Sequence, residues 1–196
     1  SKYEDGHIKN ALNFPATSTY ENIMENGKII SPLKFQNISR DLGLTIDSPI
    51  VIYDDGSFFD SARLFWTLEA YGFENVKLLN SNYDSWNDKE YPVSQKQTEI
   101  IKSDYIANVN RKRLATKFST LLATRDPNKI IIDARPKENF NGKVSSAKRY
   151  GHIPKAINIP AKSNVKTTLN GTNELLDIKS LNDIYSNIDK NKKIII

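Results

Sequence analysis

The sequence predicts an α/β protein with two similar domains, each a parallel sheet with helices on both faces. Three observations lead to this prediction. A ten-residue motif occurs twice, starting at positions 6 and 151. Short apolar runs alternate with helix-like segments, and the order motif, helix, strand is the same after each copy. Short, continuous apolar strands that alternate with helices are typical of parallel sheets buried on both faces.

The repeated motif is Gly6–Pro15, which matches Gly151–Pro160 at six of ten positions. Repeats that stack into solenoids have periods of roughly 20–50 residues. An offset of 145 positions (151 minus 6) is much longer, so it indicates duplication of a whole domain.

The first copy continues with a helix from Ser31 to Gly43. Ser31 is a favourable N-cap, Pro32 suits the first helical position, and Gly43 is a typical C-terminal stop. The elements expected next are a strand at Ile50–Tyr53, a helix from Phe58 to about Gly72 and a strand at Val76–Leu79.

The second copy shows the same succession. A helix is expected with one apolar face made of Leu114, Phe118, Leu121 and Leu122. A strand at Lys129–Asp133 follows, then the motif, a helix near residues 178–188, and a strand at Ile194–Ile196. We therefore predict one domain over residues 1–95, a polar linker over 96–104 and a second domain over 105–196.

Composition excludes several classes of protein. The chain is 38% hydrophobic and carries a net charge of +5, but its lysines are dispersed, so we expect no nucleic-acid partner. Its apolar runs are too short to cross a bilayer, and we expect no membrane association and a cytoplasmic location. No cysteine is present, which excludes disulfides, cysteine-ligated metals and cysteine catalysis by these residues. We expect no cofactor and no metal site.

Several segments resemble the rhodanese family, in particular its tandem-domain thiosulfate and 3-mercaptopyruvate sulfurtransferases. Ile131–Pro136 is similar to the opening strand of that family and its Asp-x-Arg, and the Gly-His-Ile motif follows at the expected distance. Gly72–Leu79, Trp86 and Pro92 resemble the end of such a domain. Two copies at domain spacing make this resemblance specific.

The resemblance implies a sulfurtransferase with a small anionic sulfur donor and a thiol or cyanide as acceptor. Such enzymes carry a sulfane sulfur as a cysteine persulfide. The cysteine lies in a loop between a strand and a helix, where backbone N–H groups and the positive end of the helix dipole lower the pKa of the thiol. The same groups attract an anionic donor.

In the first copy this loop begins with Asp54 and Asp55, so the resemblance implies an inactive domain. In the second copy the loop would follow Ile194–Ile196, which places the expected cysteine just beyond Ile196. The first copy also has no counterpart of the opening strand. Both domains are therefore expected to be incomplete, within a natural protein that is longer at both ends.

The candidate site residue in the second copy is Arg135, as a support of the active-site loop. Lys148 and Arg149 are weaker candidates for contact with an anionic donor, because Asn139 stands where many relatives carry a second arginine. Relatives specific for 3-mercaptopyruvate tend to carry a histidine after the first Gly-His-Ile motif. Residues 16–45 contain no histidine, so the resemblance favours thiosulfate as the donor.

The histidines and the Asp-x-Arg residues also have a purely structural interpretation. His7 and His152 are expected to satisfy loop backbone groups, and Asp133 to pair with Arg135 or with the loop. Two other functions remain open. One is a catalytically inactive rhodanese-like binding or regulatory module, and the other is a cysteine phosphatase on the same architecture.

Overall fold

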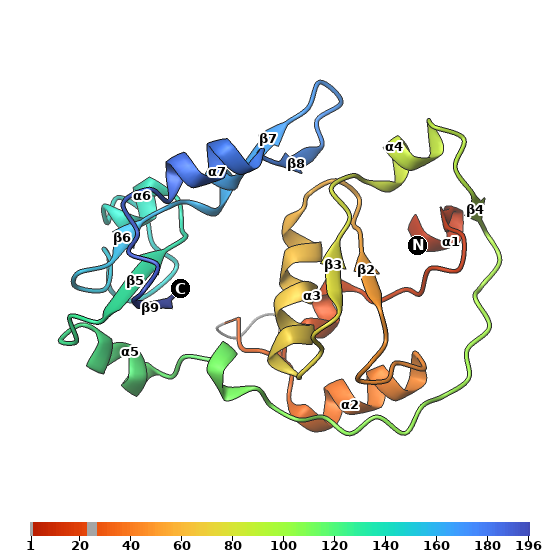
Figure 1. Cartoon of the computed structure of the whole chain (residues 1–196), viewed down its shortest axis with the longest axis horizontal. Coiled ribbons are helices and arrows are strands. Elements are labelled where there is room, and N and C mark those ends of the chain that lie inside the picture. The colour runs from red at the N-terminus through yellow and green to blue at the C-terminus, as the bar shows by residue number, and fades with distance from the viewer. Residues whose placement is uncertain (1, 23–26) are drawn as a thin grey trace. The chain divides into compact units, whose positions relative to one another are not determined.

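The computed structural model describes residues 2–22 and 27–196, which form two compact units (Figure 1). The first unit comprises Ser1–Leu114 with Leu169–Asn173, and the second comprises Ala115–Thr168 with Glu174–Ile196. Among the described residues, no helix is long and apolar enough to cross a membrane.

The boundary between the units lies later than the predicted linker over 96–104. Tyr105 is 5% exposed in the core of the first unit, and its hydroxyl donates to the carbonyl of Tyr71 at 2.9 Å. The N–H of Ala107 donates to Oε1 of Gln36 at 3.1 Å. The segment is extended and has no period of its own, so the sequence carried no signal that it packs onto the first unit.

The first unit is built from short helices and strands. In chain order they are α1 (Lys2–Asp5), β1 (His7–Ile8), the 3-10 turn η1 (Ala16–Thr19), α2 (Pro32–Asp41), β2 (Ile50–Ile52), α3 (Phe59–Ala70), β3 (Val76–Leu78), α4 (Tyr83–Asn87), β4 (Val93–Ser94) and the 3-10 turn η2 (Arg111–Arg113). The predicted helices and strands up to Leu79 are confirmed within a few residues. Gly43 and Gly72 follow α2 and α3 with φ of 66° and 90°, values that suit glycine.

The predicted parallel pairing is present in the first unit. Strand β2 runs parallel to β3, with Ile50 opposite Val76 and Ile52 opposite Leu78. Helix α3 packs against both strands (Figure 1). A second pair, β1 with β4, is antiparallel and was not predicted, because two-residue strands leave no periodic signal.

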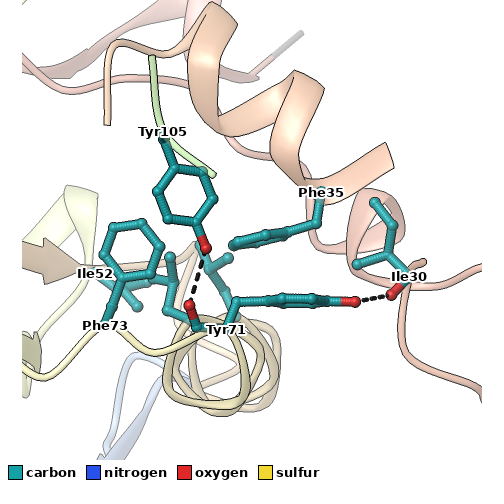
Figure 2. Packing of buried hydrophobic residues seen from close by; sticks show 8 residues of the cluster. Ile30, Phe35, Ile52, Tyr71, Phe73 and Tyr105 are labelled. Atoms are coloured by element: carbon teal, nitrogen blue, oxygen red, sulfur yellow. Dashed lines mark hydrogen bonds between the residues drawn. The ribbon is translucent and has the colours of Figure 1, made fainter. Parts of the chain in front are cut away.

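Aromatic side chains form the core of the first unit (Figure 2). Phe35 of α2 is completely buried and stacks on Tyr71, with 4.2 Å between ring centroids. The hydroxyl of Tyr71 donates to the carbonyl of Ile30. Phe73 and Tyr105 meet the ring of Phe35 edge-on. Such pairs stabilise a core beyond the area that they bury, and through them Phe35 ties α2 to the segment that follows α3 and to Tyr105.

From Lys117 onward the chain forms a second set of elements. They are α5 (Lys117–Ala123), β5 (Lys129–Asp133), α6 (Lys137–Phe140), β6 (Ile157–Asn158), the 3-10 turn η3 (Ala161–Asn164), β7 (Val165–Thr167), β8 (Asn173–Leu175), α7 (Ile178–Ile184) and β9 (Lys193–Ile195). Three of these strands make a parallel sheet in the order β6-β5-β9. The pair β7 and β8 was not predicted, because its polar sequence resembles a loop.

Strand β5 is the centre of the second sheet and is buried on both faces. Ile131 packs with Ala123 of α5 and with Ile195, whereas Ile132 packs with Ile159 and Ile188 in a separate cluster. The prediction of a parallel sheet with both faces covered is thus confirmed for this strand.

The predicted helix is present as α5, but it does not include Leu114 and its apolar side chains are not buried. Phe118, Leu121 and Leu122 are 69%, 56% and 47% exposed, and Leu114 precedes the helix. Only Ala123 is buried. The helix ends at Ala123 and begins with a capping box of Thr116 and Ser119, so local capping sets its bounds more than burial does.

Candidate active-site loops

The two Gly-His-Ile motifs fold in the same way in the two units. Nδ1 of His7 lies 2.8 Å from the carbonyl oxygen of Tyr3, and Nδ1 of His152 lies 2.8 Å from that of Phe140. Each imidazole stacks on the ring of the same aromatic partner, at 3.9 Å and 3.7 Å between centroids. Both histidines therefore have a structural role, as predicted, but the carbonyls that they contact lie in α1 and α6 and not in a loop.

The backbone repeats as well. Asn10 and Lys155, related by the offset of 145, both adopt the left-handed conformation with φ of 67°. A 3-10 turn begins directly after each motif proline, Pro15 and Pro160. A left-handed backbone is uncommon outside glycine, so its recurrence at the same motif position supports duplication of a whole domain.

An ion pair joins the carboxyl end of β5 to the motif loop. Nη2 and Nε of Arg135 lie 2.6 Å from Oδ2 and 2.9 Å from Oδ1 of Asp133, and Nη2 also donates to the carbonyl of Gly151 at 2.8 Å. The hydrogen bonds from Arg135 hold the pKa of the Asp133 carboxyl below its usual range. A bidentate arginine–carboxylate pair is geometrically specific, so Arg135 ties the turn after β5 to the loop.

Asn158 completes this brace and was missed by the sequence argument as a site residue. Its side-chain amide donates to the carbonyls of Asp133 and Arg135, both at 2.9 Å. The sequence did contain evidence for a role of this residue, because asparagine stands at the same place in both motif copies, Asn13 and Asn158. A side-chain amide that bridges two carbonyls fixes the course of a turn, and this is what a loop-supporting position requires.

In the first unit, the loop after β2 closes around the carboxylate of Asp54. The backbone N–H groups of Gly56, Phe58 and Ser61 donate to it at 2.9, 3.1 and 3.1 Å, and the hydroxyl of Ser57 donates at 3.1 Å. Burial alone would raise the pKa of Asp54, but these four donors outweigh it and lower the pKa. The loop is thus an anion cradle that the chain fills with its own carboxylate.

The remaining candidates are solvent-exposed. Asp55 pairs with Nζ of Lys2 at 2.6 Å on the surface, where such pairs contribute little to stability. Lys148 and Arg149 lie in the exposed loop before the second motif. Within the described residues, no hydrogen bond or ion pair joins either of their side chains to Arg135. No group of three or more histidine, cysteine, aspartate or glutamate residues that could hold a metal occurs in the part of the chain that the structure describes.

Asp54→Ala is expected to lower the free energy of unfolding of the first unit by about 1–2 kcal/mol at neutral pH, as loss of a helix-capping acceptor does. The pKa of Asp54 is depressed in the folded state, so its contribution is complete above the ordinary pKa of 3.8 and is lost as pH falls through the lower folded value. Urea denaturation at pH 7 and pH 3 measures this, and the difference between the variant and the parent should shrink at pH 3.

Asp55→Ala is the matched control, because the neighbouring carboxylate forms only the exposed pair with Lys2. It should change stability by no more than about 0.5 kcal/mol. Equal losses of unfolding free energy at pH 7 would show that the hydrogen bonds to Asp54 stabilise the first unit no more than the exposed pair of Asp55 with Lys2 does.

Comparison with known proteins shows the family to which the fold belongs. The family model for the rhodanese-like domain matches residues 1–89 and 114–196. A 3-mercaptopyruvate sulfurtransferase of Escherichia coli K12 is 29% identical over 163 residues, which are 81% of this chain and 58% of the relative. A putative thiosulfate sulfurtransferase of Haloferax volcanii is 28% identical over 185 residues, 90% of this chain and 64% of the relative.

A solved structure resembles the fold. The crystal structure of SseA, a 3-mercaptopyruvate sulfotransferase from Escherichia coli, matches with a TM-score of 0.83 and 27% identity, covering 98% of this chain and 72% of the other. The chain spans less than two thirds of the curated relatives described above. These relatives are sulfurtransferases, and the family model covers nearly the whole sequence. The chain therefore belongs to the rhodanese-like domain family.

Proposed function

We propose that the polypeptide to which this chain belongs transfers a sulfane sulfur from thiosulfate or 3-mercaptopyruvate to a thiophilic acceptor through a cysteine persulfide. The nucleophile is placed in the loop after β9, just beyond Ile196, and the first repeat is catalytically inactive. One observation carries the proposal. The loop after β2 gathers backbone N–H groups around a single anion, and β9 is the counterpart of β2 in the second repeat.

The chemistry follows from that cradle. A thiolate in place of the Asp54 carboxylate would be stabilised by the same donors, since these donors lower the pKa of an acid. The thiolate attacks the outer sulfur of thiosulfate, the S–S bond breaks, and sulfite leaves with the electron pair. A thiol or cyanide acceptor then attacks the outer sulfur of the persulfide, which regenerates the thiolate.

The test compares the 196-residue chain with the polypeptide of the complete gene, using thiosulfate and 3-mercaptopyruvate as donors and cyanide as acceptor. The shorter chain has no cysteine, so it should form no thiocyanate above the uncatalysed rate. The complete polypeptide should turn over with at least one donor. No turnover with either donor, together with aspartate or serine at the nucleophile position, would support the inactive binding module instead.

We propose Arg135 as a positioning residue for the loop after β9, which is the counterpart of the loop after β2. Arg135→Ala in the complete polypeptide removes the ties to Asp133 and Gly151 and should lower kcat/KM by about 10- to 100-fold, as misplacement of a catalytic group does. The loss should lie mainly in kcat, because the residue acts through the loop. Lys148→Ala and Arg149→Ala change side chains for which no hydrogen bond or ion pair with Arg135 is found among the described residues, and they should instead raise KM for the anionic donor modestly. An unchanged kcat in Arg135→Ala would contradict the positioning role.

A further inference from the structure

The excess positive charge of the chain belongs to its second unit. That unit has 15 lysines and arginines against 7 aspartates and glutamates, a net charge of +8, whereas the first unit has 13 against 16. The lysines are dispersed along the sequence, but their charge is not shared equally between the units. Such an asymmetry favours an anionic partner for the basic unit.

One surface loop of the second unit, residues 142–151, concentrates this charge, and we refer to it as the basic loop. Lys143, Lys148 and Arg149 lie within seven consecutive positions of it, and the loop contains no acidic residue. All three side chains belong to exposed residues. Among the described residues, no ion pair joins any of them to a carboxylate. Their charge is therefore available to a binding partner.

The basic loop is closed and held by its own groups. Its two ends meet, since a methyl group added at Gly142 would lie 3.1 Å from the backbone nitrogen of Gly151. Inside the loop, the hydroxyl of Ser145 donates to the carbonyl of Ala147 at 3.2 Å and to that of Arg149 at 3.3 Å. Compact surface loops with adjacent ends and internal packing are frequently functional.

The base of the basic loop is tied to the rest of the second unit. Nη2 of Arg135 donates to the carbonyl of Gly151 at 2.8 Å, and Nδ1 of His152 lies 2.8 Å from the carbonyl oxygen of Phe140 at the end of α6. A loop fixed at its base keeps its three cations near one another. Like charges held together in this way repel, and a bound anionic surface relieves the repulsion.

Exposed apolar side chains in and beside the basic loop indicate the kind of partner. Val144 is 50% exposed and Tyr150 is 65% exposed, and Ile153, two residues after the loop, is 44% exposed. Protein interfaces combine aromatic side chains and arginine with apolar contacts. A nucleic acid offers phosphates and base faces but little for aliphatic side chains, and a small anion such as thiosulfate offers no apolar surface. The combination therefore fits a protein segment that is both acidic and apolar.

We propose that the basic loop binds an acidic segment of a partner protein. Aspartate or glutamate side chains of the partner pair with Lys143, Lys148 and Arg149, and its apolar side chains pack on Val144 and Tyr150. The proposal concerns recognition and does not depend on sulfur transfer, so a binding assay tests it separately from the proposed activity.

Fluorescence anisotropy tests the proposal with the 196-residue chain and a labelled synthetic peptide of aspartate, glutamate and leucine. The peptide should bind saturably, and a peptide with lysine in place of the acidic residues should not bind. Serine in place of leucine should weaken binding several-fold, because the apolar contacts are lost. No saturable binding at millimolar peptide, or displacement of the peptide by an equimolar amount of thiosulfate, would overturn the proposal.

Two double variants with the same change of charge locate the site. Lys143→Glu with Lys148→Glu reverses charge inside the basic loop and should weaken binding by about tenfold or more, because like charges then face each other. Lys179→Glu with Lys190→Glu reverses two exposed lysines of the same unit outside the loop and should bind nearly as the parent does. All four lysines are exposed, so both variants should keep the melting temperature of the parent. Equal weakening in the two variants would mean attraction to net charge alone and would contradict the site.

Two other occupants of the basic loop are tested with the same proteins. A labelled poly(U) oligonucleotide should bind more weakly than the acidic peptide, and tighter binding that is lost in the Lys143→Glu, Lys148→Glu variant would assign the loop to a nucleic acid. The chain alone should sediment as a monomer. A dimer that the same variant abolishes would instead assign the loop to the acidic first unit of a second copy, and either result would overturn the proposal.

Discussion

Phe35→Ala is expected to lower the free energy of unfolding of the first unit by about 3–5 kcal/mol, the usual cost of removing a buried aromatic ring. Phe35 is completely buried and contacts the rings of Tyr71, Phe73 and Tyr105 (Figure 2). These contacts come from two segments of the chain, residues 71–73 and Tyr105, so the ring joins parts of the core that are distant in sequence. The measurement is urea denaturation followed by the fluorescence of Trp66, which lies on α3.

Leu33→Ala is the control for this prediction. Leu33 lies on the same helix, α2, but is 67% exposed, so its truncation should change stability by no more than about 0.5 kcal/mol. If both substitutions cost the same, the aromatic contacts of Phe35 do not stabilise the first unit.

Alkaline pH is expected to unfold the first unit steeply above pH 10. Burial raises the pKa of Tyr71 and of Tyr105 to about 12, from an ordinary value of 10.0. The neutral phenols therefore contribute stability that is complete below pH 10 and is lost as pH rises towards 12, because only the unfolded chain ionises freely in that window. Denaturation midpoints measured from pH 8 to pH 12 test this.

Tyr71→Phe separates ionisation from other alkaline effects. The variant should be less stable at pH 8, by about 1–3 kcal/mol, because it leaves the carbonyl of Ile30 without its donor. Its stability should nevertheless fall less between pH 10 and pH 12 than that of the parent. A parallel loss in both proteins would mean that ionisation of Tyr71 does not drive the alkaline transition.

The elements that the sequence predicted correctly share a physical cause. Pro32 and Gly43 bound α2 through local backbone preferences, whereas Ser31 stands at the N-cap without a side-chain capping hydrogen bond. The short apolar runs at Ile50–Ile52 and within Lys129–Asp133 form parallel strands, as their composition predicted. The duplicated motif extended these predictions from one unit to the other.

The failures have a different origin. The apolar face of α5 was inferred from spacing alone, yet spacing does not say whether a surface is present to cover it. The extension of the first unit to Leu114 depends on single long-range contacts, such as that of Tyr105 with Tyr71, which leave no local pattern. The exposure of α5 and the extent of the first unit both depend on tertiary packing, which local sequence patterns do not encode.

The candidate site was partly visible in the sequence. Asp133 and Arg135 form the pair that was expected, and Asp54 occupies the loop where a nucleophile was expected. That Asp54 accepts four hydrogen bonds, and that Asn158 braces the turn after β5, required the structure, because both depend on loop geometry. The contrast supports the proposal of one self-occupied and one reactive loop.

The intact mass of the complete gene product after treatment with thiosulfate, with and without cyanide, tests the proposed sulfur transfer most directly. We predict the addition of one sulfur atom that cyanide removes, located by peptide mapping to a cysteine in the segment directly after Ile196. An unmodified mass, or a sulfur adduct elsewhere in the polypeptide, would contradict the assignment of the reactive loop to the second repeat.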